Sequence, residues 1–100
     1  MIEIDARSLQ AKLGNVVVLD VRNPPEVQAE GAIDGSLLIP MNDLPRRLAE
    51  IPADREIVAV CKRGMRSYTV ANWLRSQGRD AVSLAGGIDQ WRALGLPLTR

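Results

Sequence analysis

The chain has 100 residues, a formal net charge of +1, and 46% hydrophobic and 25% charged residues. This length predicts a single domain, residues 1–100, with enough buried surface for a hydrophobic core. The small net charge argues against a general nucleic-acid or membrane surface, so any attraction for anions must be local. We therefore expect neither a nucleic-acid nor a membrane partner.

The cysteine and histidine counts exclude several kinds of chemistry. Cys61 is the only cysteine, and the chain has no histidine. These counts exclude an internal disulfide, a multi-cysteine zinc site, a Cys–His dyad, a histidine-ligated metal and an imidazole base. We expect no metal and no cofactor. The amino terminus shows no secretory signal and no apolar run is long enough to cross a bilayer, so a cytoplasmic location is the default expectation.

The first half of the chain is predicted to contain three strands and two helices. Asp5 is a suitable N-cap for the first helix, and Gly14 is a suitable stop. Pro24 and Pro25 can start the second helix, because a missing N–H is harmless in a first turn. The expected elements are a strand at 2–4, a helix with Ala6, Leu9 and Leu13 on one face, a strand at 16–21, a helical turn ending at Gly31, and a short buried strand at 36–39.

The second half is predicted to contain two strands and three helices. Leu44, Leu48 and Ile51 recur at helical spacing, which predicts a helix at 42–51 with Pro45 in its first turn. The other expected elements are a strand at 56–61, a helix with Ser67, Val70, Ala71 and Leu74 on one face, a strand at 81–84 and a helix at 88–94. Such alternation predicts an α/β fold with a small, mostly parallel sheet of about five strands and helices on both faces.

The residues around Cys61 indicate a reactive site. Cys61 ends an apolar strand, and the carboxyl ends of strands are where ligands bind in open α/β sheets. The helix that follows presents free N–H groups and the positive end of its dipole. Lys62, Arg63 and Arg66 add three positive charges near the sulfur. These surroundings favour the thiolate, the reactive form of cysteine.

A lone cysteine at the end of an apolar strand is, by itself, more often a buried core thiol than a nucleophile. Here the following residues favour the nucleophile, because an inert thiol has no use for so many cations. Gly64 allows the loop to wrap around the sulfur with its N–H groups inward. Arg66 stands where the helix dipole disfavours a cation, so we expect it either to bind a donor anion or to hold the loop.

The loop from Cys61 to Ser67 resembles the active-site loop of rhodanese-like sulfurtransferases. Three more segments are similar to signatures of that family and occur in the same order: Asp20-Val21-Arg22 with Glu26, residues 31–40, and Leu84-Ala85-Gly86-Gly87-Ile88 with Trp91, Gly95 and Pro97. Each motif alone is weak, but together they are specific and cover nearly the whole chain.

The resemblance implies a rhodanese-like fold and a sulfurtransferase mechanism. Cys61 would take a sulfane sulfur from thiosulfate or a similar small anionic donor, and pass it from a persulfide to cyanide or a thiol. Loop amides would stabilise the persulfide, and nearby cations would steer the donor. The implied substrate-binding residues are Lys62, Arg63, Gly64, Met65, Arg66 and Ser67. Asp20, Arg22 and Glu26 would give structural support, through an ion pair involving Glu26 or a hydrogen bond to a neighbouring loop.

Other functions use similar loops. Cysteine phosphatases place five residues between Cys and Arg, whereas Arg66 comes one position earlier and Ser67 takes that place. The spacing therefore disfavours a cysteine phosphatase or an arsenate reductase. A non-enzymatic persulfide carrier or regulatory interaction module needs the same thiolate and amides, so the sequence leaves it open, with a sulfur-donor or acceptor protein as its partner. A redox sensor is disfavoured because there is no resolving cysteine. The physiological donor, the acceptor and the oligomeric state stay open.

Overall fold

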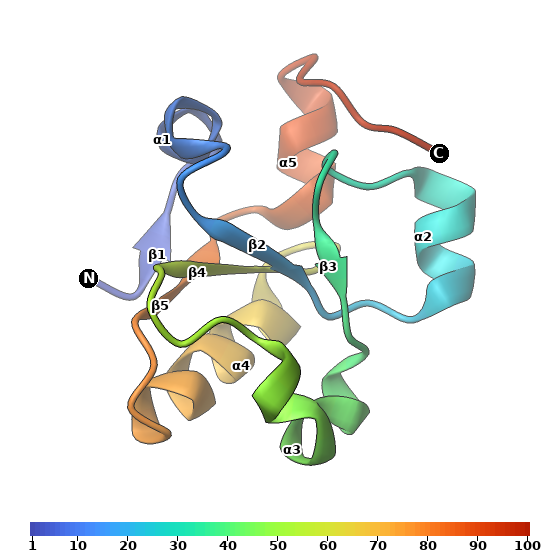
Figure 1. Ribbon diagram of the computed structural model, residues 1–100. Coiled ribbons are helices and arrows are strands. Elements are labelled where there is room, and N and C mark those ends of the chain that lie inside the picture. The colour runs from blue at the N-terminus through green and yellow to red at the C-terminus, as the bar shows by residue number, and fades with distance from the viewer.

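One five-stranded sheet forms the centre of the molecule (Figure 1). The computed structural model describes all residues from Met1 to Arg100. The strands are β1 (Glu3–Ile4), β2 (Val17–Asp20), β3 (Leu37–Leu38), β4 (Ile57–Val60) and β5 (Ala81–Leu84), in the order β1-β5-β4-β2-β3. Every pairing between them is parallel, which confirms the predicted sheet.

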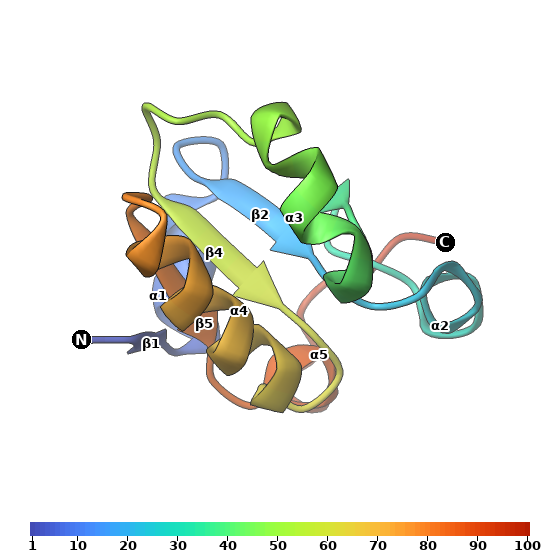
Figure 2. The same cartoon turned by 90° about the horizontal axis from the view of Figure 1, so that it is seen from below.

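Helices cover both faces of this sheet. The five helices are α1 (Ala6–Lys12), α2 (Pro24–Glu30), α3 (Leu44–Arg47), α4 (Met65–Ser76) and α5 (Gly87–Ala93), and all except α2 contribute residues to the core on one face or the other. Alternate side chains of β4 belong to two separate core clusters, because successive residues of a strand point to opposite faces. One cluster includes Leu9 and Trp91 of α1 and α5, and the other includes Leu44 and Leu74 of α3 and α4. Figures 1 and 2 show these two pairs of helices on opposite sides.

Local sequence signals set most of the element boundaries. Asp5 caps α1 by accepting a hydrogen bond from the Ser8 N–H at 2.8 Å. The predicted inner face of α4 is buried. Trp91 is buried, and its Nε1 donates to the carbonyl of Pro97 at 2.9 Å, so it is a packing residue. None of the helices has the length and apolar character needed to cross a lipid bilayer.

The predicted helix at 42–51 is wrong as a single element. The segment consists of a 3₁₀ turn at Met41–Asp43, the short helix α3, and a second 3₁₀ turn at Leu48–Glu50. Pro45 has no N–H to donate to the carbonyl of Met41, and Leu44 makes a shorter-range bond to that carbonyl instead. Ile51 precedes a proline and adopts an extended conformation at ψ 125°, which ends the helical run.

The strand predicted at 36–39 is shorter than expected and only partly buried. β3 has two residues, both of intermediate exposure. It lies at the edge of the sheet and pairs only with β2. The next residue, Ile39, is buried and continues the core.

Candidate active site

Cys61 lies directly after β4, the central strand, and shortly before α4. Because all strands are parallel, their carboxyl ends meet at one edge of the sheet, and the residue stands at that edge. It is only 1% exposed. An open hollow reaches it, and the other residues that line this hollow are Lys62, Arg63, Met65 and Arg66. The structure therefore brings the predicted nucleophile together with four of the predicted substrate-binding residues.

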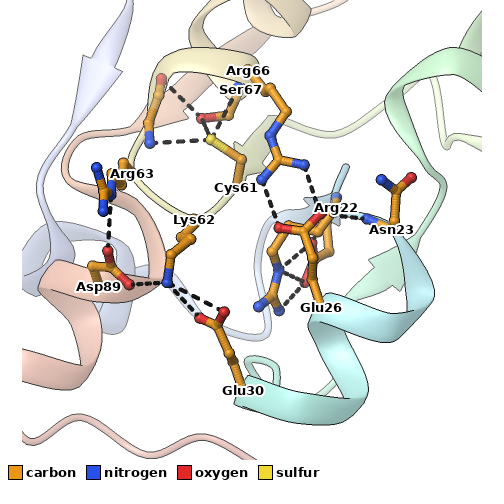
Figure 3. Close-up of polar contacts among 12 residues, drawn as sticks. Arg22, Asn23, Glu26, Glu30, Cys61, Lys62, Arg63, Arg66, Ser67 and Asp89 are labelled. Atoms are coloured by element: carbon orange, nitrogen blue, oxygen red, sulfur yellow. Dashed lines mark hydrogen bonds and ion pairs between the residues drawn. The ribbon is translucent and has the colours of Figure 1, made fainter.

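The sulfur of Cys61 takes the place of a helix N-cap. α4 has Gly64 as its N-cap residue, at φ +103°, and glycine has no side chain that could accept the free N–H groups. Cys61 Sγ accepts them instead, from the backbone N–H of Gly64 at 3.1 Å and of Ser67 at 3.4 Å (Figure 3). The positive end of the helix dipole lies at the same point. Fixed donors therefore point at the sulfur.

The start of α5 holds the loop from the other side. The N–H of Ile88 donates to the carbonyl of Cys61 at 2.9 Å, and that of Asp89 donates to the carbonyl of Lys62 at 3.0 Å. Gly87 makes this approach possible, because a Cβ there would lie 2.4 Å from the Cys61 carbonyl oxygen. With these carbonyl groups bonded to α5, the N–H groups that follow in the loop face the sulfur.

Two opposing effects set the acidity of Cys61. Burial raises the pKa of its thiol, and hydrogen bonds lower it. The donors to the thiolate are the Ser67 hydroxyl, 3.4 Å from the sulfur, and the backbone N–H groups of Ser67 and Gly64. Together they outweigh the burial, and the pKa lies below the ordinary value of a cysteine thiol. Neutral pH therefore leaves more of Cys61 as thiolate than of a free cysteine, without an imidazole base.

Arg66 is bound to α2. Its Nη1 and Nη2 donate to Oε1 and Oε2 of Glu26, both at 2.8 Å (Figure 3). Oε1 also accepts the backbone N–H of Asn23 at 3.1 Å, which closes the first turn of α2. The guanidinium of Arg66 lowers the pKa of Glu26 to about 2. Of the two roles expected for Arg66, the structure shows the one that holds the loop.

Lys62 and Arg63 also have carboxylate partners. Lys62 Nζ lies 3.1 Å from Glu30 and 3.1 Å from Asp89, and Arg63 Nε lies 3.4 Å from Asp89. Arg92 approaches the same two carboxylates at 3.8 and 3.7 Å. Together with the Arg66–Glu26 pair, these ion pairs join four cations and three carboxylates, whose charges sum to +1. The three cations of the loop are thus largely compensated.

Asp20 and Arg22 pair with each other at the end of β2. Both are buried, at 1% and 0% exposure. The Arg22 guanidinium donates to both Asp20 oxygens, with the shortest distance 2.7 Å, and its Nη2 donates to the carbonyl of Gly31 at 2.8 Å. The predicted hydrogen bond to a neighbouring loop is therefore present. Arg22 forms no ion pair with Glu26, because the Glu26 carboxylate binds Arg66 of the active-site loop.

Met65 and Ser67 differ sharply although both lie in the first turn of α4. Met65 is 80% exposed at the rim of the hollow, whereas Ser67 is fully buried beside the sulfur.

Sequence reasoning missed Glu30, Asp89 and Ser83. Glu30 follows Glu26 at i+4, which places both on one face of a helix. Ser83 is the only polar residue in the apolar strand β5. These were the available signals.

This geometry agrees with a known protein family. A family model for the rhodanese-like domain matches residues 5–94. The chain belongs to the rhodanese-like family. This confirms the resemblance that the loop and the three other motifs indicate.

Individual relatives resemble the rhodanese-like domain over most of its length. A sulfurtransferase of Allochromatium vinosum is 42% identical over 100 residues, which cover 96% of this chain and 92% of that protein. The thiosulfate sulfurtransferase GlpE of Pseudoalteromonas translucida is 36% identical, with 79% of this chain and 75% of that protein covered. The crystal structure of a rhodanese-related protein from Thermoplasma volcanium has a TM-score of 0.94 at 30% identity and covers 99% of this chain and 98% of the other.

Proposed function

We propose that this rhodanese-like domain is a sulfurtransferase in which Cys61 carries the transferred sulfur as a persulfide. The observation that carries the proposal is the sulfur itself, which accepts the N–H groups of Gly64 and Ser67 and has a lowered pKa. Membership of the family and the sulfurtransferase-named relatives support sulfurtransferase activity in general.

The finer proposal is a two-step transfer from thiosulfate. The Cys61 thiolate attacks the outer sulfur of thiosulfate, a new S–S bond forms, and the S–S bond of the donor breaks. Sulfite leaves with the bonding electron pair, so Cys61 now carries a persulfide anion. Cyanide or a thiolate then attacks the terminal sulfur, and the S–S bond to Cys61 breaks to return the thiolate. Neither step needs a proton shuttle, an oxidant or a metal.

The residues of the site have separate roles in this scheme. The N–H groups of Gly64 and Ser67 stabilise the Cys61 thiolate, which is the nucleophile of the first step and the leaving group of the second. Lys62 and Arg63 line the entrance of the hollow. Their carboxylate partners compensate part of their positive charge, and the remaining charge attracts the anionic donor. Arg66 holds the loop to α2, and the Asp20–Arg22 pair holds the end of α2.

The loop charges disfavour a phosphatase. A cysteine phosphatase needs an arginine that binds two oxygens of the phosphate dianion. Here the loop arginine, Arg66, gives both of its terminal nitrogens to Glu26. The same compensation favours a second candidate within sulfur chemistry, a persulfide carrier that takes sulfur from a donor protein. A protein persulfide has one negative charge at its reacting sulfur, so it relies less than thiosulfate on free cations.

Intact-protein mass spectrometry after incubation with thiosulfate tests the proposal. We expect the mass of one sulfur atom to be gained, to map to Cys61, and to be lost on addition of cyanide. The matched control is Cys61→Ser, which replaces one small buried atom and should unfold at a similar temperature but gain no mass. A gain that persists in Cys61→Ser would contradict the proposed sulfur carrier.

A protein persulfide donor separates the two candidates. If thiosulfate gives no gain while a desulfurase persulfide does, the domain is a carrier rather than a thiosulfate sulfurtransferase. If neither donor modifies a thiol that iodoacetamide still alkylates, the persulfide proposal is wrong.

A further inference from the structure

Ser83 is a buried hydroxyl that the transfer scheme does not use. It lies in β5, between Val82 and Leu84, and is 0% exposed. Its Oγ is 2.7 Å from the Oγ of Ser67 and has no other hydrogen-bond partner. A hydroxyl buried without a hydrogen bond is unfavourable, so this one contact accounts for how Ser83 is accommodated.

The positions of the protons in this contact follow from counting acceptors. Ser67 Oγ also lies 3.3 Å from the carbonyl oxygen of Gly64 and 3.4 Å from Cys61 Sγ. If Ser67 donated to Ser83, the Ser83 proton would have no acceptor at all. If Ser83 donates to Ser67, every proton finds an acceptor, because the Ser67 proton can go to the carbonyl or to the sulfur. The second arrangement is therefore the stable one.

Ionisation of Cys61 then decides where the Ser67 proton goes. As a thiolate, Sγ has no proton of its own and becomes a charged acceptor, and hydrogen bonds to charged acceptors are the stronger ones. Ser67 then gives its proton to the charged sulfur in place of the Gly64 carbonyl, and its own oxygen still accepts from Ser83. The hydrogen bonds then run in one direction, from Ser83 to Ser67 to Cys61.

We propose that Ser83 is a positioning residue, whose hydroxyl donates to Ser67 and so directs the Ser67 hydroxyl at the Cys61 sulfur. Ser83 does not touch the substrate or the sulfur in this scheme. That this arrangement serves to hold an anionic sulfur rests on the proposed function. The experiment that tests the role of Ser83, however, uses only the Cys61 thiol and no sulfur donor.

The other charged groups near the sulfur do not depend on Ser83. Arg66 interacts with Cys61 through space, and Asp20 interacts with Arg66 in the same way. Both are held by separate ion pairs, to Glu26 and to Arg22. Replacing Ser83 therefore changes the hydrogen bonds of Ser67 while the charges around the site stay in place.

The test is the pH dependence of alkylation of Cys61 by iodoacetamide, which reports the pKa of the thiol. Ser83→Ala removes one oxygen atom, and we expect the pKa of Cys61 to rise by about 0.5 to 1. Ser67→Ala should raise it further, because the direct donor is lost. In the Ser67→Ala background, adding Ser83→Ala should leave the pKa unchanged, since Ser83 then has no hydroxyl to act through. Thermal unfolding of each variant verifies that it is folded.

Two results would overturn the proposal: an unchanged pKa in folded Ser83→Ala, or the same rise in both backgrounds. The unmodified protein gives an independent measurement that needs no variant. The ¹³Cβ resonances of Ser67 and Ser83 should both titrate at the pKa of Cys61, and a Ser83 resonance insensitive to that titration would also refute the inference. Because alkylation needs no sulfur donor, failure of thiosulfate to modify the protein leaves this test intact.

Discussion

Replacing Glu26 by Gln tests how the active-site loop is held to α2. The change keeps the size of the side chain and one acceptor oxygen for the N–H of Asn23. It removes the negative charge and one of the two oxygens that accept from Arg66 at 2.8 Å. The side-chain amide nitrogen introduced by Glu26→Gln would face a guanidinium nitrogen of Arg66, and two donors cannot form a hydrogen bond with each other. We therefore expect Glu26→Gln to lower the free energy of unfolding.

The lowered pKa of Glu26 sets the size of this effect. A fall from the ordinary 4.5 to about 2 corresponds to about 3 kcal/mol at most. The side chains are 27% and 35% exposed, so solvent screens the pair and we expect about 1 to 2 kcal/mol at pH 7. Because the pKa is lowered on folding, this contribution is complete above a pH of about 4.5 and is lost as the pH falls through about 2.

Urea unfolding followed by tryptophan fluorescence measures the prediction. The difference in unfolding free energy between the unmodified protein and Glu26→Gln should fall to less than half by pH 3. Glu3→Gln is the matched control, because Glu3 is exposed, has no ion pair, and undergoes the same change of charge. A difference that stays constant from pH 7 to pH 3 would show that the ionised pair with Arg66 is not its source.

Three further variants test other parts of the site. Lys62→Ala combined with Arg63→Ala should raise KM for thiosulfate by up to about fivefold and change kcat less. The effect is limited because the carboxylate partners already compensate most of the charge of these two residues. Steady-state kinetics measures both constants, and an unchanged KM would exclude a steering role. Gly87→Ala should lower the free energy of unfolding by more than about 2 kcal/mol and abolish sulfur transfer, because its Cβ would lie 2.4 Å from the Cys61 carbonyl oxygen. Gly14→Ala is the control: its Cβ would have nothing within 4 Å, so the loss should be only about 1 kcal/mol. Arg22→Met should cost about 3 to 5 kcal/mol in urea unfolding by leaving a buried carboxylate unpaired, and a loss below about 1 would refute that role.

The sequence predicts the fold and the position of Cys61 well because the relevant signals are local. The apolar β4 run, the helical spacing of Val70, Ala71 and Leu74, and the positive φ of Gly64 each depend on residues close by in the chain. Where local signals conflict, the prediction is wrong. The helix expected at 42–51 has the right apolar spacing, but the missing N–H of Pro45 makes its start a 3₁₀ turn, and the proline after Ile51 ends the helical run.

The partners of the loop cations could not be predicted, because they depend on how distant elements meet. Glu26 is 40 residues away from Arg66 in the chain, and Glu30 is 32 residues away from Lys62. The sequence singles out Glu26 through the family signature and places Glu30 on the same helix face, but it does not show which cation either carboxylate meets. The same reason hides Ser83, whose contact with Ser67 crosses from β5 to α4.

Compensated cations suit a site in which the charge of the sulfur does not change. In the proposed cycle a thiolate and a persulfide alternate, and each carries one negative charge. Fixed N–H donors from Gly64 and Ser67 stabilise the thiolate to which the cycle returns. A free arginine would bind thiosulfate and the sulfite product alike, since both are dianions, and would slow release as much as it aids binding. By pairing Arg66 with Glu26, the domain holds the loop to α2 and leaves the stabilisation of the sulfur to uncharged donors, the loop N–H groups and the Ser67 hydroxyl.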